Sequence, residues 1–111
     1  LQAVQFRGMA DTYLPETFDG LKKVLAMDWD RMITGHPGPG GRQTGTKDDV
    51  RNVLGYLEDL SAAVKKEVDA NRSYDQAMDA IKLEKYQQWG GYGPFFKMNI
   101  ERMYDFHNRG I

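Results

Sequence analysis

The sequence predicts a mainly α-helical domain of about four helices with one or two short strands. Three observations lead to this fold class. Apolar residues recur every three or four positions over residues 46–69, as they do along one face of a helix. A shorter pattern of the same period covers residues 15–27. Residues 37–45, which are rich in glycine and proline, separate the two patterns and predict a loop.

The N-terminal part is expected to combine an extended segment with the first helix. Val4 and Phe6 alternate with polar residues, so residues 1–13 favour a strand or an extended loop. The helix over 15–27 begins at Pro15, and proline suits the first turn because its missing N–H would have no partner there. Apolar residues at helical spacing then define one face of this helix.

A strand is expected over residues 30–36, where a short apolar run ends at Gly35 and His36. One or two strands do not form a stable sheet by themselves, because three or more are normally needed. Two interpretations follow. The chain is a small helical domain with an isolated β segment, or it is the C-terminal part of an α/β protein whose other strands lie upstream of Leu1. The first residue is not methionine, which favours the second interpretation.

The helix over 46–69 is the clearest element of the sequence. The hydroxyl of Thr46 can cap its first turn, and Asp48 and Asp49 lie where carboxylates interact favourably with the positive end of a helix. Asn71 suits a left-handed stop after it. The apolar stripe consists of Val50, Val53, Leu54, Leu57, Leu60, Val64 and Val68.

Residues 73–111 predict a helical C-terminal extension. Ser73 and Gln76 form a capping-box pattern that begins a short helix. Residues 82–93 form a connection rich in aromatic residues and glycine, and Pro94 begins the last helix. The inner face and the end of that helix are expected to hold Phe96, Ile100, Met103, His107 and Gly110.

The composition argues against several classes of function. The 111 residues include 15 Lys and Arg against 16 Asp and Glu, for a net charge of −1. Nucleic acids and anionic membranes select a surplus of basic residues, so neither is an expected partner. The absence of cysteine excludes disulfides, thiolate metal sites and thiol nucleophiles. No apolar run approaches the ~18 residues of a membrane span. Residues 1–111 fit one domain, and nothing assigns a compartment.

His36 is the main candidate for chemistry. It lies at the end of the expected strand and at the start of the glycine-proline loop, where α/β folds commonly place ligands and catalytic groups. A neutral imidazole there can bind zinc, act as a base or hydrogen-bond a backbone carbonyl, and the residue type alone leaves these alternatives open. The loop is not a phosphate loop, because it lacks the G-x-x-x-x-G-K-[ST] pattern.

Other polar and aromatic residues have simpler interpretations. The pair Asp28 and Asp30 and the pair Asp48 and Asp49 are interpreted as solvated charge, and His107 as a hydrogen-bonded core or interface residue. A cluster of aromatic residues near the last helix is a candidate substrate wall, although such residues more often pack a helix onto its neighbours. The cluster consists of Tyr86, Trp89, Tyr92, Phe95 and Phe96.

Longer stretches of the chain resemble a known family. Residues 24–39, VLAMDWDRMITGHPGP, resemble the last conserved segment of metallo-β-lactamase-fold hydrolases, in which a helix leads into a strand that ends in Gly-His. Residues 45–60, GTKDDVRNVLGYLEDL, are similar to the helix that follows. The segments KLEKYQQWGGYGPFF and NIERMY are similar to the C-terminal extension of one branch of the family. The resemblance covers essentially the whole chain.

The resemblance implies an αββα sandwich that holds one or two metal ions, usually zinc, at an edge of its sheets. Most ligands in the family come from an H-x-H-x-D-H motif, a second His and a bridging Asp, none of which this sequence contains. The final ligand of the family, the His of Gly-His, corresponds to His36. Gly35, Pro37 and Gly38 would then shape the loop at the metal, although Pro37 replaces a common glycine.

This family would make the chain the C-terminal part of a metal-dependent hydrolase. The chain alone is expected to be inactive and to bind no zinc tightly, because an activating metal needs three or more converging protein ligands. Its expected partners are the missing N-terminal half of the domain and, in the whole protein, a small-molecule substrate. Trp89 and Tyr92 would line the substrate site. Helix faces without their sheets would be exposed, so the isolated chain is expected to form a homo-oligomer.

Two alternatives belong to other classes of function. The chain can be an autonomous helical interaction module in which His36 has no chemical role. The aromatic segment 86–96 can also serve as a contact surface for a peptide or a lipid. The superfamily hydrolyses lactams, thioesters, phosphodiesters and sulfate esters, so the resemblance does not select a substrate.

Overall fold

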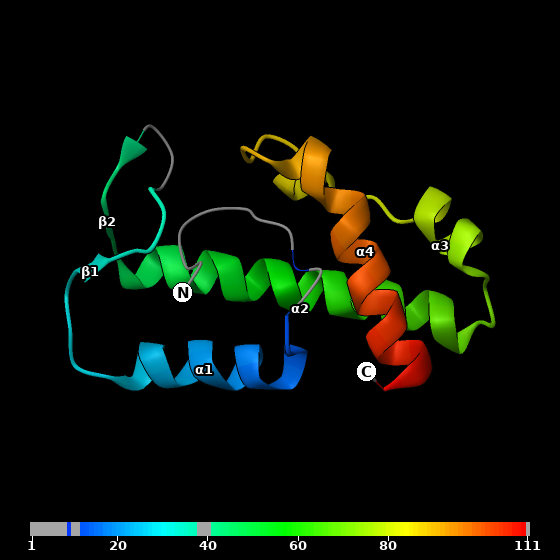
Figure 1. The fold of residues 1–111 in the computed structure, drawn as a ribbon, viewed down its shortest axis with the longest axis horizontal. Helices are drawn as coiled ribbons and strands as arrows, with labels where there is room; N and C mark the ends of the chain where they lie inside the picture. Colours follow the sequence, from blue (N-terminus) through cyan, green and yellow to red (C-terminus); the bar gives the residue numbers. More distant parts are fainter. Residues whose placement is uncertain (1–8, 10–11, 38–40, 111) are drawn as a thin grey trace.

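The computed structural model describes residues 9, 12–37 and 41–110 of the chain. In this part it contains four α-helices, one short 3-10 helix and a sheet of two strands (Figure 1), so the prediction of a mainly helical chain is confirmed. The extended segment expected over residues 1–13 falls largely outside the described residues. The elements in chain order are α1 (Leu14–Ala26), β1 (Met32–Ile33), β2 (Thr44–Gly45), α2 (Lys47–Asp69), α3 (Tyr74–Ala80), η2 (Glu84–Tyr86) and α4 (Tyr92–Arg109).

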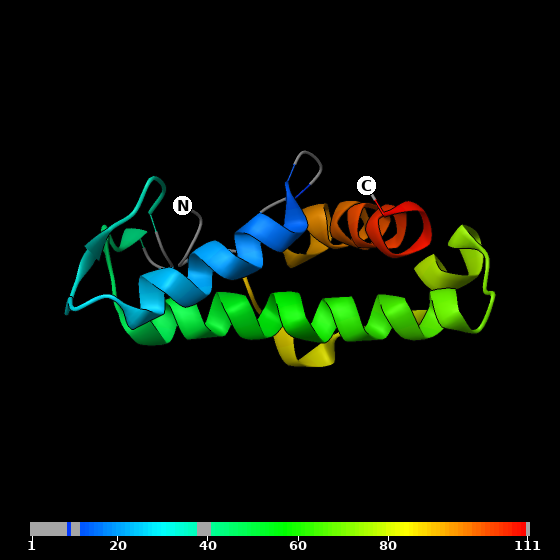
Figure 2. The same ribbon diagram turned by 90° about the horizontal axis from the view of Figure 1, so that it is seen from below.

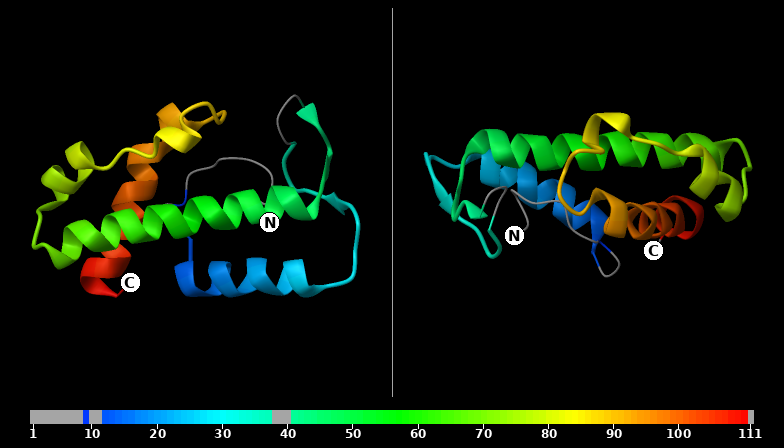
Figure 3. Two further views of the ribbon diagram at one scale, coloured as in Figure 1. Left: turned by 180° about the vertical axis from the view of Figure 1, so that it is seen from behind. Right: turned by 90° about the horizontal axis from the view of Figure 1, so that it is seen from above.

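Helix α2 is the central element of an elongated molecule of 43 × 26 × 21 Å. Helices α1 and α4 lie on one side of it, and η2 lies on the opposite side (Figure 2). Helix α1 runs antiparallel to the N-terminal half of α2, while α4 crosses the C-terminal half (Figure 3). Removal of apolar side chains from water between these helices is the main source of stability. The stripe of α2 supplies Val50, Leu57, Leu60 and Val64, all of them buried.

Local hydrogen bonds explain where α2 begins and ends. The hydroxyl of Thr46 accepts a bond from the backbone N–H of Asp49 at 3.4 Å, and Oδ2 of Asp49 accepts one from the N–H of Thr46 at 2.7 Å. This reciprocal pair is a capping box, which satisfies two backbone donors that the helix leaves without partners. Beyond the helix, Asn71 has the left-handed backbone that the sequence indicates, with φ 55°.

Helix α1 begins and ends one residue earlier than the predicted range, with Pro15 in its first turn. Its C-terminal end is closed by side chains that follow it in the sequence. The indole Nε1 of Trp29 donates to the carbonyl oxygen of Val24 at 2.6 Å, and Nζ of Lys47 donates to that of Met27 at 2.8 Å. The second of these bonds connects the end of α1 to the beginning of α2.

The two strands form an antiparallel pair, with Met32 opposite Gly45 and Ile33 opposite Thr44. The structure corrects two expectations here. The strand expected over 30–36 pairs at only two residues, and the loop expected over 37–45 ends in a strand. The strand therefore has a partner within the chain. Gly45 in β2 allows the backbone of β1 to approach closely. The composition of residues 37–45 indicates only a loop and does not reveal this pairing.

The C-terminal elements follow the predicted order with one shift. Ser73 and Gln76 form a second capping box at the start of α3. Helix α4 begins two residues before Pro94, directly after Gly91, whose φ of 90° turns the chain into the helix. Proline is tolerated throughout the first turn because those N–H groups have no acceptor within the helix. Gly110 ends α4 with φ 74°.

A polar side chain lies within the contact between α2 and α4. Asn99 is fully buried, and it is the one polar or charged residue in the core of the described part. Nearby, Nε of Arg102 donates to the carbonyl oxygen of Thr12 at 3.0 Å. Both α4 side chains therefore help to hold the chain that precedes α1, since Oδ1 of Asn99 accepts from the backbone N–H of Met9 at 2.8 Å.

Candidate functional site

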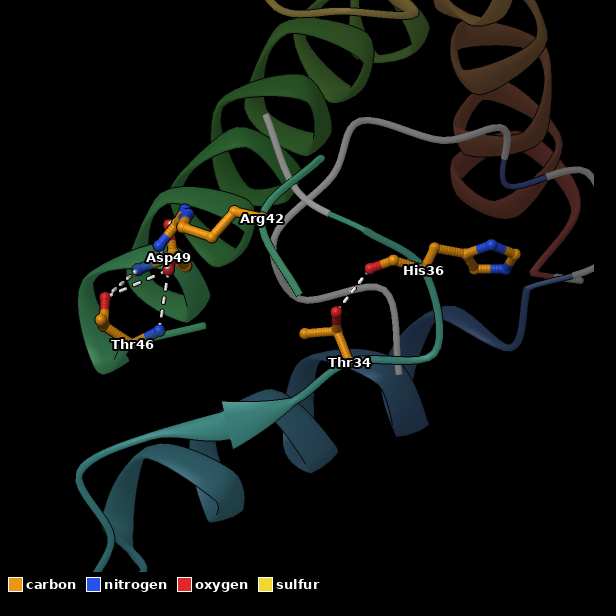
Figure 4. A network of polar contacts seen from close by, with 5 residues as sticks. All are labelled: Thr34, His36, Arg42, Thr46 and Asp49. Atoms are coloured by element: carbon orange, nitrogen blue, oxygen red, sulfur yellow. Dashed lines mark hydrogen bonds and ion pairs between the residues drawn. The ribbon is translucent and has the colours of Figure 1, made fainter. Parts of the chain in front are cut away.

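The two-stranded sheet places His36 at one end of the molecule. His36 lies in the connection between β1 and β2, and its side chain is exposed. The hydroxyl of Thr34 donates to the carbonyl oxygen of His36 at 2.5 Å, which holds the backbone in a tight turn. Figure 4 shows the imidazole pointing away from Thr34 and from the start of α2. None of the described residues forms a hydrogen bond or an ion pair with this imidazole.

The residues beside His36 shape the loop in different ways. Gly35 and Pro37 are both exposed, and Gly38 lies outside the described residues. A Cβ at Gly35 would meet nothing within 4 Å, so the available space there does not demand glycine. Gly41, in contrast, has φ 77°, a left-handed backbone that side chains disfavour. Nothing in the sequence distinguishes Gly41 from the other glycines of this loop.

An ion pair fastens the second half of this loop to α2. Nη1 and Nη2 of Arg42 donate to Oδ2 and Oδ1 of Asp49 at 2.9 and 2.7 Å (Figure 4). The same carboxylate accepts from the N–H and the hydroxyl of Thr46 at 2.7 and 3.1 Å. Two-point binding of a guanidinium restricts its orientation as well as its position. The loop that carries His36 is thus anchored to the capping box of the long helix.

Asp49 was expected to be a solvated charge at the positive end of the helix, and it proves to bind both Arg42 and Thr46. The hydrogen bond from Arg42 is the main reason that the pKa of Asp49 is lowered, and it also raises the pKa of Arg42. Asp48 does fit the sequence interpretation, because it is exposed and pairs with Arg51 on the surface at 2.7 Å. The spacing Thr46-x-x-Asp49 is the signal that indicates the capping role.

A metal site at His36 would need further ligands beside this imidazole. The described residues contain no cluster of three or more His, Cys, Asp or Glu side chains that could hold a metal ion. An exposed imidazole without a bonded partner suits a metal ligand, but a catalytic zinc site needs three protein ligands. His36 fits the role of one ligand, and a complete site needs further ligands from outside the described residues.

Trp89 and Tyr92 lie elsewhere on the molecule. The ring centroid of Trp89 is 4.8 Å from that of Tyr86 in η2. The hydroxyl of Tyr92 accepts from the N–H of Leu83 at 3.3 Å. The connection from η2 to α4, which contains Trp89 and leads into Tyr92, lies beside the middle of α2, whereas the strand pair lies at the N-terminal end of α2 (Figure 1). The structure thus does not bring them to His36.

His107 is a packing residue at the contact between α2 and α4. Its Nε2 lies 2.9 Å from the hydroxyl oxygen of Ser61, and the ring is partly buried. Burial is the main reason that the pKa of His107 is lowered, and the nearby charge of Lys65 lowers it further. This agrees with the prediction of a hydrogen-bonded histidine rather than a ligand.

Among the described helices, none combines the length and the apolar character that are needed to cross a membrane. Searches of protein-family models, of curated proteins and of solved structures found no match to the chain.

Proposed function

We propose that this chain is the C-terminal part of a metal-dependent hydrolase with the metallo-β-lactamase fold, and that His36 is one of its metal ligands. One observation carries the proposal. An exposed imidazole without a partner among the described residues follows a strand, on a loop that an ion pair anchors to a long helix. This is the order of elements on which the sequence resemblance depends.

Strand β1 supports the proposal that the sheet is incomplete. β1 pairs with β2 along one edge, and no other described strand pairs with it. The side chain of Ile33 in β1 is 89% exposed, although an apolar residue in a strand is usually covered. Further strands of an αββα sandwich, contributed by the N-terminal half of the same domain, would pair with the other edge of β1, and the completed sandwich would cover Ile33.

The role of the chain in the reaction would be to position one imidazole. A bound zinc ion lowers the pKa of a water ligand and polarises a carbonyl or an ester. The other ligands, one or two metal ions and the small-molecule substrate would belong to the whole protein. The bond from Thr34 and the Arg42–Asp49 pair would keep His36 in place, because a ligand must be held by its supporting contacts.

The test compares two histidine variants of the natural full-length protein. His36→Ala is expected to reduce the metal content, measured by plasma mass spectrometry, and to abolish hydrolysis while the fold is kept. His107→Gln is the matched control, since His107 is partly buried and contacts Ser61 between α2 and α4, and it should keep both. Equal metal content in the His36 variant and the unsubstituted protein would disprove the proposal. An upstream reading frame without an H-x-H-x-D-H motif would also disprove it.

A second candidate is an autonomous helical interaction module. The observation that favours it is that all four described helices contribute buried residues to one core, to which His36 contributes nothing. This candidate predicts that His36→Ala changes no activity of the full-length protein. Light scattering of the isolated chain at about tens of micromolar also distinguishes the two candidates. A fragment of a hydrolase should associate through its uncovered sheet-facing surfaces, so a monomer would favour the interaction module.

A further inference from the structure

A cavity of about 250 Å³ lies on the side of α2 that faces η2. It is independent of the proposed hydrolase site, because no residue of the His36 loop lines it. Cavities for drug-sized ligands begin at about 300 Å³, so this one suits a molecule of one ring. Its lining consists of Arg51, Asn52, Gly55, Lys85, Tyr86 and Trp89.

The aromatic wall of the cavity is held in a fixed orientation. The ring of Tyr86 is edge-on to Tyr56 at 5.2 Å and to Trp89 at 4.8 Å. Its hydroxyl donates to Oδ2 of Asp59 at 2.6 Å, and burial together with this bond raises the pKa of Tyr86, so the wall stays uncharged. Trp89 is partly exposed. A rigid wall of this kind loses little conformational freedom when an aromatic ring packs against it.

Two cations line the cavity and none of the six lining residues is acidic. Arg51 pairs with Asp48 at 2.7 Å, but both side chains are largely exposed. Nζ of Lys85 lies 3.8 Å from Oδ2 of Asp59, beyond hydrogen-bond distance. Exposed ion pairs contribute little to stability, so a carboxylate in the cavity can compete for both cations. Arginine in particular matches the two oxygens of a carboxylate.

Gly55 forms the part of the cavity wall that belongs to the backbone of α2. Glycine is unfavourable inside a helix, and this one stands in the middle of the longest described helix. A Cβ at this position would meet only the hydroxyl of Tyr86, at an ordinary contact distance of 3.8 Å. Internal packing therefore does not require glycine here. Its effect is to leave open the space that a methyl group would occupy.

We propose that this cavity binds a small planar aromatic carboxylate. The ring would pack against Trp89 and the edge of Tyr86 over the backbone at Gly55, and the carboxylate would bind Arg51 and Lys85. The amide of Asn52 adds a donor and an acceptor at the same wall. The aromatic wall favours a ring over a simple anion, and the two cations favour an acid over a neutral ring.

The experiment is a titration of the ¹⁵N-labelled chain with sodium benzoate, followed by NMR. The indole N–H signal of Trp89 and the amide signal of Gly55 should shift and saturate. The indole N–H of Trp29 is an internal control, because it donates to Val24 at the end of α1. Benzamide, which keeps the ring without the charge, and acetate, which keeps the charge without the ring, should both bind more weakly than benzoate.

Matched variants identify the cavity as the binding site. Gly55→Ala and Arg51→Gln should each weaken benzoate binding by about three- to tenfold. Gly20→Ala, at a position in α1 with open space around it, and Lys66→Gln, on the exposed surface of α2, should leave binding unchanged. The proposal is overturned if the shifts do not saturate, if Trp29 shifts with Trp89, or if Gly55→Ala and Arg51→Gln bind like the unsubstituted chain. Equal binding of benzamide or of acetate would also overturn it.

Discussion

Asn99 donates a hydrogen bond from Nδ2 to the hydroxyl of Tyr56 at 2.9 Å, across the contact between α4 and α2. Both residues are buried. The other amide atom of Asn99 accepts from the backbone of Met9, so one side chain joins three separate parts of the chain. Burying a polar group costs free energy unless it is hydrogen-bonded. This contact therefore stabilises the fold and also favours one arrangement of α2 and α4.

Substitution of Asn99 should strongly destabilise the fold. Asn99→Ala leaves the hydroxyl of Tyr56 and the N–H of Met9 without this partner and opens a small cavity, and we expect a loss of about 3 kcal/mol. Asn108→Ala changes an exposed residue of the same helix and should stay within about 0.5 kcal/mol. Urea unfolding measures both. Similar unfolding midpoints for the two variants would contradict the role of Asn99.

The stability of the chain should depend on the protonation of His107. Because its pKa is lower in the folded chain than the ordinary 6.5, the unfolded state binds more protons between these two values. The contribution is fully present above about pH 6.5 and is lost as the pH falls through the folded pKa. Urea midpoints between pH 8 and 5 should fall more steeply for the unsubstituted chain than for His107→Gln. Parallel pH curves would refute this.

The contribution of the Arg42–Asp49 ion pair to stability should be measurable by substitution of Asp49. Asp49→Ala removes the partner of Arg42 and half of the capping box, and we expect it to destabilise the chain by about 1–2 kcal/mol. Asp48→Ala removes an exposed pair and should change stability by less than about 0.5 kcal/mol. Because the pKa of Asp49 is lowered, its contribution is present above the ordinary value of 3.8 and is lost as the pH falls through the folded pKa. An equal effect of the two alanine variants would argue against the anchor.

Substitution of three glycines by alanine should change the stability of the chain in different directions. Gly20→Ala and Gly55→Ala lie in helices with room for a Cβ, so each should stabilise the chain by about 0.5–1 kcal/mol. Gly41→Ala should destabilise it, because the φ of 77° is strained for a side chain. Thermal or urea unfolding of the three variants tests the backbone assignment. Destabilisation by Gly55→Ala would mean that the helix is more crowded at this position than the contact of 3.8 Å indicates.

His36 should be dispensable for the stability of the chain itself. Its imidazole is exposed, so His36→Ala is expected to shift the unfolding free energy by less than about 0.5 kcal/mol. His107→Ala, which removes a partly buried ring and the contact with Ser61, should lose about 1 kcal/mol or more. A large loss in the His36 variant would assign His36 a structural role in this chain.

The sequence by itself determined where most helices begin and end. The capping boxes at Thr46 and Ser73 and the left-handed stop at Asn71 depend on contacts between residues at most a few positions apart. The stripe of α2 has the period of the helix that displays it, so most of its buried face was also predictable, although Tyr56 was missed and Val53, Leu54 and Val68 are only partly buried. His36 was identifiable as a candidate because its signal, a strand end before a glycine-rich loop, is equally local.

The tertiary structure decided the contacts between distant segments. The pairing of Thr44–Gly45 with β1, the two-point bond between Arg42 and Asp49, and the burial of Asn99 join segments that the sequence pattern treats independently. The same holds for Trp89, which lies against η2 and α2 instead of beside His36. Periodicity and capping patterns reflect interactions between residues that are close in the sequence. Which side chain meets a distant backbone depends on how the helices pack, and that arrangement exists only in the folded chain.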